Sequence, residues 1–174
     1  KLKCNGVGGN MLSLLSSFLH DRLQRVVLNG QSSNWVKITA GVPQGSILGP
    51  LLFLIYINDI SNNLESDVKL FADDTSLFSP VFDANLTADI LNNDLVRINQ
   101  WAHQWKMSFN PNVSKQAHEV IFSKKINDVN HPNLLFNDIN VKKVDYQKHL
   151  GLTLDNKLTF DNHINMIIEK TSRA

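Results

Sequence analysis

Two adjacent carboxylates, Asp73 and Asp74, stand between two short segments that have the length and composition of β-strands, residues 68–71 and 75–78. Only a tight turn fits between strands this close, so the pattern predicts a β-hairpin with both carboxylates at its tip. Asp-Asp is also a common turn dipeptide, because short carboxylates cap turns through the backbone. The pair alone therefore leaves a purely structural role open.

A second segment, residues 41–50, holds three glycines and two prolines in ten residues and leads directly into an apolar stretch. Pro50 is tolerated in a first helical turn, so we predict a helix over 51–60. Glycines let the backbone approach a ligand closely, and a helix N-terminus favours anionic groups. Gln44 can donate and accept hydrogen bonds at a base or sugar edge. Taken alone, this composition also fits a loop without a ligand; the carboxylate pair that follows favours a ligand site.

Composition sets outer bounds on the fold. The 174 residues suffice for one domain, and the apolar content of 43% is ordinary. Cys4 is the only cysteine, which excludes an internal disulfide framework and a thiolate zinc site. The net charge is +1, but residues 1–37, 38–105 and 106–174 carry +4, −6 and +3. An acidic centre between basic flanks suits a metal site with phosphate-contacting walls, although chance patterning explains it equally well.

The remaining periodicities predict an α+β fold with an antiparallel sheet. Helical spacing of apolar residues follows Asn10, a predicted N-cap, and recurs over 83–105 and 158–168. Asn29-Gly30 predicts a tight turn between two strands. Strands are predicted over the segments 24–28, 35–39, 119–122, 134–136, 139–141 and 146–154.

Several blocks of the sequence occur together in one known family, in its order and at its spacing. They are Ser17-Phe18-Leu19, residues 22–30, residues 41–60, Phe71-Ala72-Asp73-Asp74-Thr75, residues 101–111 and His149-Leu150-Gly151. In these blocks the chain resembles the reverse transcriptases of non-LTR retrotransposons, of the jockey-like kind, over essentially its whole length. The resemblance implies a partial polymerase palm over residues 1–155, with an antiparallel sheet and helices on one face, and the start of a helical thumb over 156–174.

The resemblance also implies roles for individual residues. Residues 41–50 resemble motif B, which lies over the templating base and incoming nucleotide through Pro43, Gln44, Gly45 and Ser46. Residues 71–74 resemble motif C, the metal-binding turn, with Asp73 and Asp74 as catalytic metal ligands and Phe71 and Ala72 beside the nucleotide and template. Arg22 matches a basic position near the template or nucleotide.

Two later motifs complete the resemblance. Residues 106–122, with the helix before them, resemble motif D. Lys115 in that segment would stand near the leaving pyrophosphate as a proton donor, with Lys106 and Lys124 as rivals nearby. The sequence also resembles motif E, the primer grip, at His149, Leu150 and Gly151.

The implied activity is RNA-directed DNA polymerisation, in which a primer 3′ hydroxyl attacks a deoxynucleoside triphosphate and pyrophosphate leaves. Two Mg²⁺ ions, for which Mn²⁺ could substitute, would stabilise the attacking and leaving oxygens. The implied partners are an RNA template, a DNA primer and deoxynucleoside triphosphates, and the implied location is intracellular, in cytoplasm and nucleus. No membrane partner is expected, because the apolar run 47–57 is too short to span a bilayer and Gly49-Pro50 interrupts it.

The family's motif A supplies a third carboxylate from an earlier strand, which we expect before Lys1, in a missing upstream part of the same polyprotein. Asp21 is the only acid before residue 59, and it stands at the predicted end of a helix. We therefore expect the isolated chain to be nearly inactive and its sheet to keep an unpaired edge. The alternative is a non-catalytic retroelement remnant that acts at most as a nucleic-acid-binding or interaction module. An RNA-templated polymerase of another branch, such as an intron maturase, is disfavoured by the jockey-like block over residues 101–111.

Overall fold

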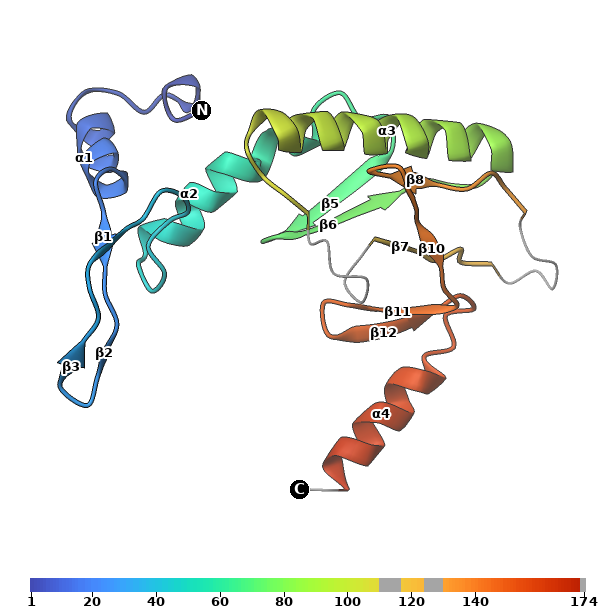
Figure 1. The fold of residues 1–174 in the computed structure, drawn as a ribbon. Coiled ribbons are helices and arrows are strands. Elements are labelled where there is room, and N and C mark those ends of the chain that lie inside the picture. The colour runs from blue at the N-terminus through green and yellow to red at the C-terminus, as the bar shows by residue number, and fades with distance from the viewer. Residues whose placement is uncertain (110–116, 124–129, 173–174) are drawn as a thin grey trace. The chain divides into compact units, whose positions relative to one another are not determined.

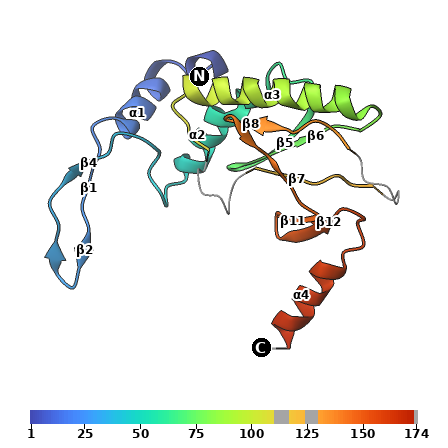
Figure 2. The same cartoon turned by 45° about the vertical axis from the view of Figure 1, so that its right-hand side comes forward.

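The computed structural model describes residues 1–109, 117–123 and 130–172 (Figure 1; Figure 2). These residues form two compact units. The first unit consists of residues 1–62 and 70–75, and the second of residues 63–69 and the described residues from 76 onward. Across the described ranges, no helix combines the length and the apolar character that crossing a membrane requires.

Two helices and two 3₁₀ turns carry the buried side chains of the first unit. The turn η1 (Lys3–Asn5) precedes helix α1 (Gly9–Leu19), whose N-cap is Gly8 rather than the predicted Asn10. Helix α2 (Leu48–Ile57) continues into η2 (Asn58–Ser61), so the predicted helix 51–60 starts earlier and tightens at its end. The buried apolar side chains on these elements are Leu15, Leu52, Ile57 and Ile60.

A long hairpin follows α1 in the first unit. Strand β1 (Leu23–Gln24) pairs antiparallel with β4 (Val36–Lys37), and β2 (Val27–Leu28) with β3 (Gln31–Ser32). The predicted strand 24–28 is therefore two strands. Between them the Val26 N–H donates to the Ser33 hydroxyl at 2.9 Å, which interrupts the regular ladder. Asn29 and Gly30 have φ of 49° and 77°, which confirms the predicted tight turn.

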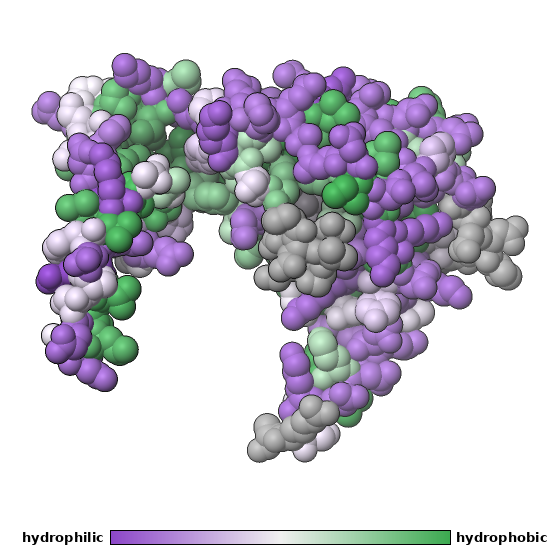
Figure 3. Space-filling view, viewed as in Figure 1, coloured by the Kyte–Doolittle hydropathy of each residue, from purple (hydrophilic) through white to green (hydrophobic). Residues whose placement is uncertain are grey.

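Hydrophobic side chains remain on the surface of this hairpin. Figure 3 shows them along β2, where the side chains of Val26, Val27 and Leu28 are exposed. Strands of two residues form few ladder hydrogen bonds and cover little apolar surface. The hairpin therefore contributes no buried side chain to the first unit among Leu23 to Lys37.

Strands β5 (Asp67–Phe71) and β6 (Asp74–Phe78) form one two-stranded sheet. Their bounds match the predicted segments 68–71 and 75–78 within one residue. The predicted hairpin around the carboxylate pair is thus confirmed. The turn end, residues 70–75, belongs to the first unit.

The second unit is built around helix α3 (Ala84–Gln104), close to the predicted helix 83–105. Its N-cap is Asp83, whose carboxylate accepts the Leu86 N–H at 2.8 Å. Strand β8 (Leu135–Phe136) lies against α3 in both views (Figure 1; Figure 2) and pairs antiparallel with β9 (Ile139–Asn140). The buried apolar side chains of this layer are Ala88, Ile98, Ala102 and Leu134.

The end of the second unit differs from the sequence prediction in two places. The predicted strand 146–154 is a hairpin of β11 (Tyr146–His149) and β12 (Leu152–Asp155), because Leu150 and Gly151 turn the chain with φ of 48° and 89°. Helix α4 (Asp161–Thr171) starts later than the predicted helix 158–168. Its delayed start has a cause in β12: the Asp155 carboxylate accepts hydrogen bonds from the Lys157, Thr159 and Phe160 N–H groups, which holds that segment in a loop.

The prediction of one antiparallel sheet with helices on one face is not met by the described residues. Their strands form six separate two-stranded sheets. One of these, β7 (His118–Glu119) with β10 (Lys142–Lys143), is parallel. Most of the strands are only two residues long. The mixed α+β class itself is confirmed.

Candidate active site

The turn between β5 and β6 presents the carboxylate pair. Ala72 and Asp73 form the turn, and Asp74 is the first residue of β6. Ala72 has φ of 52°, in the left-handed region that costs a residue with a Cβ about 1–2 kcal/mol. Backbone strain of this kind concentrates at functional sites. Both carboxylates are exposed, so the hairpin offers two hard oxygen donors to solvent.

The alternation of β5 fixes how the turn is anchored. Val68 and Leu70 are half-buried, whereas Lys69 and Phe71 are exposed. Side chains of a strand alternate between its two faces, so Leu70 lies on the covered face. The Phe71 side chain is 63% exposed beside the carboxylate pair. The sequence left open which of the two neighbours anchors the hairpin, and the structure assigns this to Leu70.

The segment 41–50 consists of a loop, residues 41–47, and the first residues of helix α2, and it has its own internal hydrogen bonds. The Ser46 hydroxyl donates to the Pro43 carbonyl at 2.7 Å and accepts the Gly49 N–H at 3.0 Å. A Cβ on Gly49 would lie 2.9 Å from the Pro43 carbonyl oxygen, so only glycine fits there without displacing the loop. Gly45 has φ of 77° and lies with Gln44 in an exposed turn.

Arg22 reaches the first residue of this loop. Its guanidinium donates to the Gly41 carbonyl at 2.6 Å and to the Leu19 carbonyl at 3.3 Å. The half-buried Arg22 side chain thus lies on the protein backbone. Residues 22, 41–50 and 70–75 all belong to the first unit.

The donor set of the turn suits a hard divalent cation. Mg²⁺ usually takes one or two carboxylates and completes its shell with phosphate and water. Asp73 and Asp74 supply two carboxylates. Within the three described ranges, no group of three Asp, Glu, His or Cys side chains is placed to hold a metal ion. At this turn the described residues therefore offer two carboxylates.

The predicted primer-grip residues belong to the second unit. His149 ends β11 and is half-buried, and Leu150 and Gly151 form the tight turn that joins β11 to β12. They therefore stand at the tip of a hairpin rather than within a continuous strand. Lys115, the predicted proton donor, and its rival Lys124 lie outside the described residues. The other rival, Lys106, follows Trp105, the C-cap of α3, and has φ of 57°.

Asp94 is a buried charge that the sequence prediction missed. Its carboxylate is 0% exposed and accepts the Glu65 and Ser66 N–H groups, the Ser66 hydroxyl at 2.7 Å and the Arg97 guanidinium at 3.0 Å. Burial acts to raise the pKa of Asp94, but these hydrogen bonds outweigh it and hold that pKa below its usual range. The available signal was a carboxylate on the apolar face of α3, between Ile90 and Ile98.

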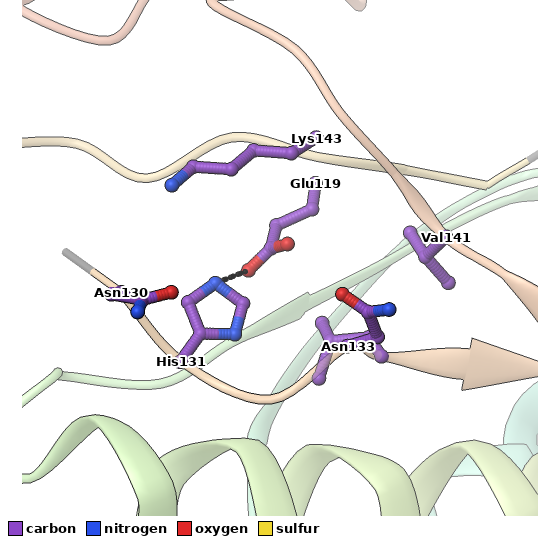
Figure 4. A pocket seen from close by; sticks show the side chains of 7 residues that line it. Glu119, Asn130, His131, Asn133, Val141 and Lys143 are labelled. Atoms are coloured by element: carbon purple, nitrogen blue, oxygen red, sulfur yellow. Dashed lines mark ion pairs between the residues drawn. The ribbon is translucent and has the colours of Figure 1, made fainter. Parts of the chain in front are cut away.

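A second missed feature is a polar cavity of about 220 Å³ in the second unit. Figure 4 shows the His131 imidazole directed at the Glu119 carboxylate, with 2.9 Å between Nε2 and Oε1. The other ring nitrogen lies 2.7 Å from the Pro132 carbonyl oxygen. Burial raises the pKa of Glu119, and the neighbouring His131 and Lys143 oppose that rise in part. Both ring nitrogens of His131 thus have protein partners, so we assign the Glu119–His131 pair a structural role.

Comparison with known proteins identifies the family of the chain. Residues 3–161 match the family described as reverse transcriptase (RNA-dependent DNA polymerase). The chain is 32% identical over 162 residues to an RNA-directed DNA polymerase from the mobile element jockey of Drosophila melanogaster, which covers 88% of this chain. It is 31% identical over 156 residues, or 87% of the chain, to a probable RNA-directed DNA polymerase from the transposon X-element of the same species.

The chain spans about 17% of the length of these curated relatives. No solved structure matches it. The matched family region nevertheless contains the 41–50 loop, the Asp73-Asp74 turn and the His149–Gly151 turn. The expected resemblance is thereby confirmed, and we conclude that the chain belongs to the reverse transcriptase family, with jockey-like non-LTR retrotransposon polymerases as its relatives.

Proposed function

We propose that this chain is part of an RNA-directed DNA polymerase that adds deoxynucleotides to a DNA primer on an RNA template. The observation that carries the proposal is the exposed Asp73-Asp74 turn, strained at Ala72, in a chain of the reverse transcriptase family. Family membership implies use of a divalent metal, and the two carboxylates are the ligands that Mg²⁺ prefers.

Asp73 and Asp74 would hold the metal, as Mg²⁺ with Mn²⁺ as a possible substitute. A pair of bound ions supplies charge stabilisation to the attacking and leaving oxygens of the phosphoryl transfer. The protein's part is to present both carboxylates on a stiff hairpin, with Leu70 on the covered face and Phe71 and Ala72 beside the reacting groups. A third carboxylate would come from the upstream part of the same polyprotein.

The remaining site residues would position the substrates. Pro43, Gln44, Gly45 and Ser46 would face the templating base and incoming nucleotide, supported by the exposure of Gln44 and Gly45. His149, Leu150 and Gly151 would hold the primer end, and Lys115 would protonate the leaving pyrophosphate. In this proposal residues 1–155 form a partial palm and 156–174 the start of a thumb.

Primer extension on an RNA template with Mg²⁺ tests the proposal. The chain would be compared with a version extended upstream through its own reading frame, each with and without Asp73→Asn. We expect activity only in the extended version and its loss in the variant. Exposed Asp73 should be dispensable for folding, so circular dichroism spectra of the variant and parent should coincide.

Two other results would change the conclusion. No activity in either version, with clean folding and retained nucleic-acid binding, would favour the non-catalytic remnant. Activity in the short chain alone would show that two carboxylates suffice and that the expected upstream ligand is unnecessary.

A further inference from the structure

One arginine connects three separate backbone positions in the first unit. The Arg22 guanidinium donates to the carbonyls of Leu19 and Gly41, at 3.3 and 2.6 Å, and the Arg22 carbonyl accepts the Ile38 N–H at 2.9 Å. Leu19 is the last residue of α1, Ile38 follows β4, and Gly41 is the first residue of the 41–50 loop. Arg22 therefore fixes where the chain leaves the hairpin and starts the loop.

The far end of the loop is fixed independently. Ser46 bridges the Pro43 carbonyl and the Gly49 N–H, and the missing Cβ of Gly49 lets helix α2 approach the Pro43 carbonyl. Between the two fixed ends, Gln44 and Gly45 form the exposed turn. The loop is therefore held at both ends while Gln44 and Gly45 stay accessible to solvent.

We propose that Arg22 is a positioning residue, which fixes the geometry of the 41–50 loop before any ligand binds. This inference rests on the proposed function, in which the loop meets the incoming nucleotide and template. In this role Arg22 acts on the nucleotide indirectly rather than through a direct contact. Its planar guanidinium donates to two carbonyls at once, and the resulting loop geometry then determines how well a nucleotide is held.

A lysine at this position separates the two roles. Lysine keeps the positive charge but lacks the planar fork that serves two acceptors in fixed directions. If Arg22 served only as a charge for a phosphate, Arg22→Lys would leave the ligand-free loop as it is. If Arg22 shapes the loop, the loop should loosen without any nucleotide or nucleic acid present.

Amide hydrogen exchange of the chain in the absence of ligand tests this. In Arg22→Lys we expect exchange of the Gly49 amide, which donates to the Ser46 hydroxyl at the far end of the loop, to rise about five- to tenfold, because one or two hydrogen bonds that hold the loop are lost. Arg25→Lys is the matched control, because Arg25 lies over the Trp35 ring at 4.6 Å on the same hairpin. It should leave exchange of the Gly49 amide unchanged.

Gly49→Ala perturbs the same loop from its other end and should raise exchange of the residue-49 amide, because its Cβ would lie 2.9 Å from the Pro43 carbonyl oxygen. Unchanged exchange of the Gly49 amide in Arg22→Lys would overturn the proposal. A rise that extends equally through α2 would also overturn it, because it would show general destabilisation of the first unit.

The kinetic arm uses the upstream-extended polymerase. Arg22→Lys should raise the KM for deoxynucleoside triphosphate about fivefold or more, with kcat changed less and primer-template affinity retained. An altered kcat with an unchanged KM would contradict the positioning role. If the exchange result holds but no version polymerises, the positioning inference stands and the proposed function fails, so the two failures are distinguishable.

Discussion

Replacing the buried Asp94 carboxylate should destabilise the second unit more than any surface substitution on the same helix. The carboxylate is 0% exposed and accepts hydrogen bonds from two backbone N–H groups, the Ser66 hydroxyl and the Arg97 guanidinium. Asp94→Asn keeps the shape but turns an N–H₂ toward groups that are themselves donors. Removing one partner of a buried ion pair costs about 3–5 kcal/mol. Arg97 is 41% exposed and can turn to water, so we expect about 2–3 kcal/mol.

The pH dependence of this effect has a definite sign. The folded-state pKa of Asp94 lies below its unfolded value of about 3.9, so its stabilisation is fully present above that value. It is lost as the pH falls through the folded-state pKa, where Asp94 takes up a proton and becomes similar to asparagine. The gap between parent and Asp94→Asn should therefore be widest near neutral pH and narrow in acid.

Urea unfolding followed by circular dichroism, from neutral pH down to about pH 3, measures this gap. Asp89→Asn on the exposed side of α3 is the matched control and should change stability by about 0.5 kcal/mol or less. A gap below about 0.5 kcal/mol for Asp94→Asn at neutral pH would refute the reasoning. So would a gap that stays constant as the carboxylate titrates.

Three further predictions concern the turn and the start of α4. Ala72→Val should destabilise the chain by about 1 kcal/mol, because a β-branched residue tolerates φ of 52° less well than alanine; thermal unfolding measures it, and an unchanged Tm would contradict the assigned strain. Asp73→Asn in the upstream-extended version should abolish Mg²⁺-dependent primer extension without changing its melting curve; retained activity would remove Asp73 from the site. Hydrogen bonds from the Thr159, Phe160 and Lys157 N–H groups lower the pKa of Asp155, so protection of the Thr159 and Phe160 amides should persist at the ordinary carboxyl pKa of about 3.9 and be lost only as the pH falls through the lower folded-state pKa; protection already lost above about pH 3.9 would contradict this.

Predictions from the sequence were correct where the structure depends only on residues close together in the chain. The hairpin around Asp73-Asp74, the Asn29-Gly30 turn and helix α3 all follow from turn chemistry and periodicity over a few residues. The family resemblance rested on the same short blocks, and the match over residues 3–161 confirms it. These features require no knowledge of distant contacts.

Predictions failed where a local turn or a side-chain hydrogen bond to the backbone, rather than the hydrophobic periodicity, sets the structure. The segment 146–154 lacks a strong turn dipeptide, yet Leu150 and Gly151 adopt left-handed φ and close a hairpin. Helix α4 begins late because the Asp155 carboxylate captures the N–H groups that a helix would otherwise use. Neither event leaves a periodic mark in the sequence.

For the candidate site, the sequence by itself determined which residues belong together: the carboxylate pair, the glycine-rich loop and the family that joins them. Only the tertiary structure decided how they are held. It assigns Arg22 to the Gly41 carbonyl, Gly49 to the space beside Pro43 and Leu70 to the covered face of β5. The physical reason is that motif identity depends on residue type and spacing, whereas hydrogen-bond partners and steric fit depend on groups far apart in the chain.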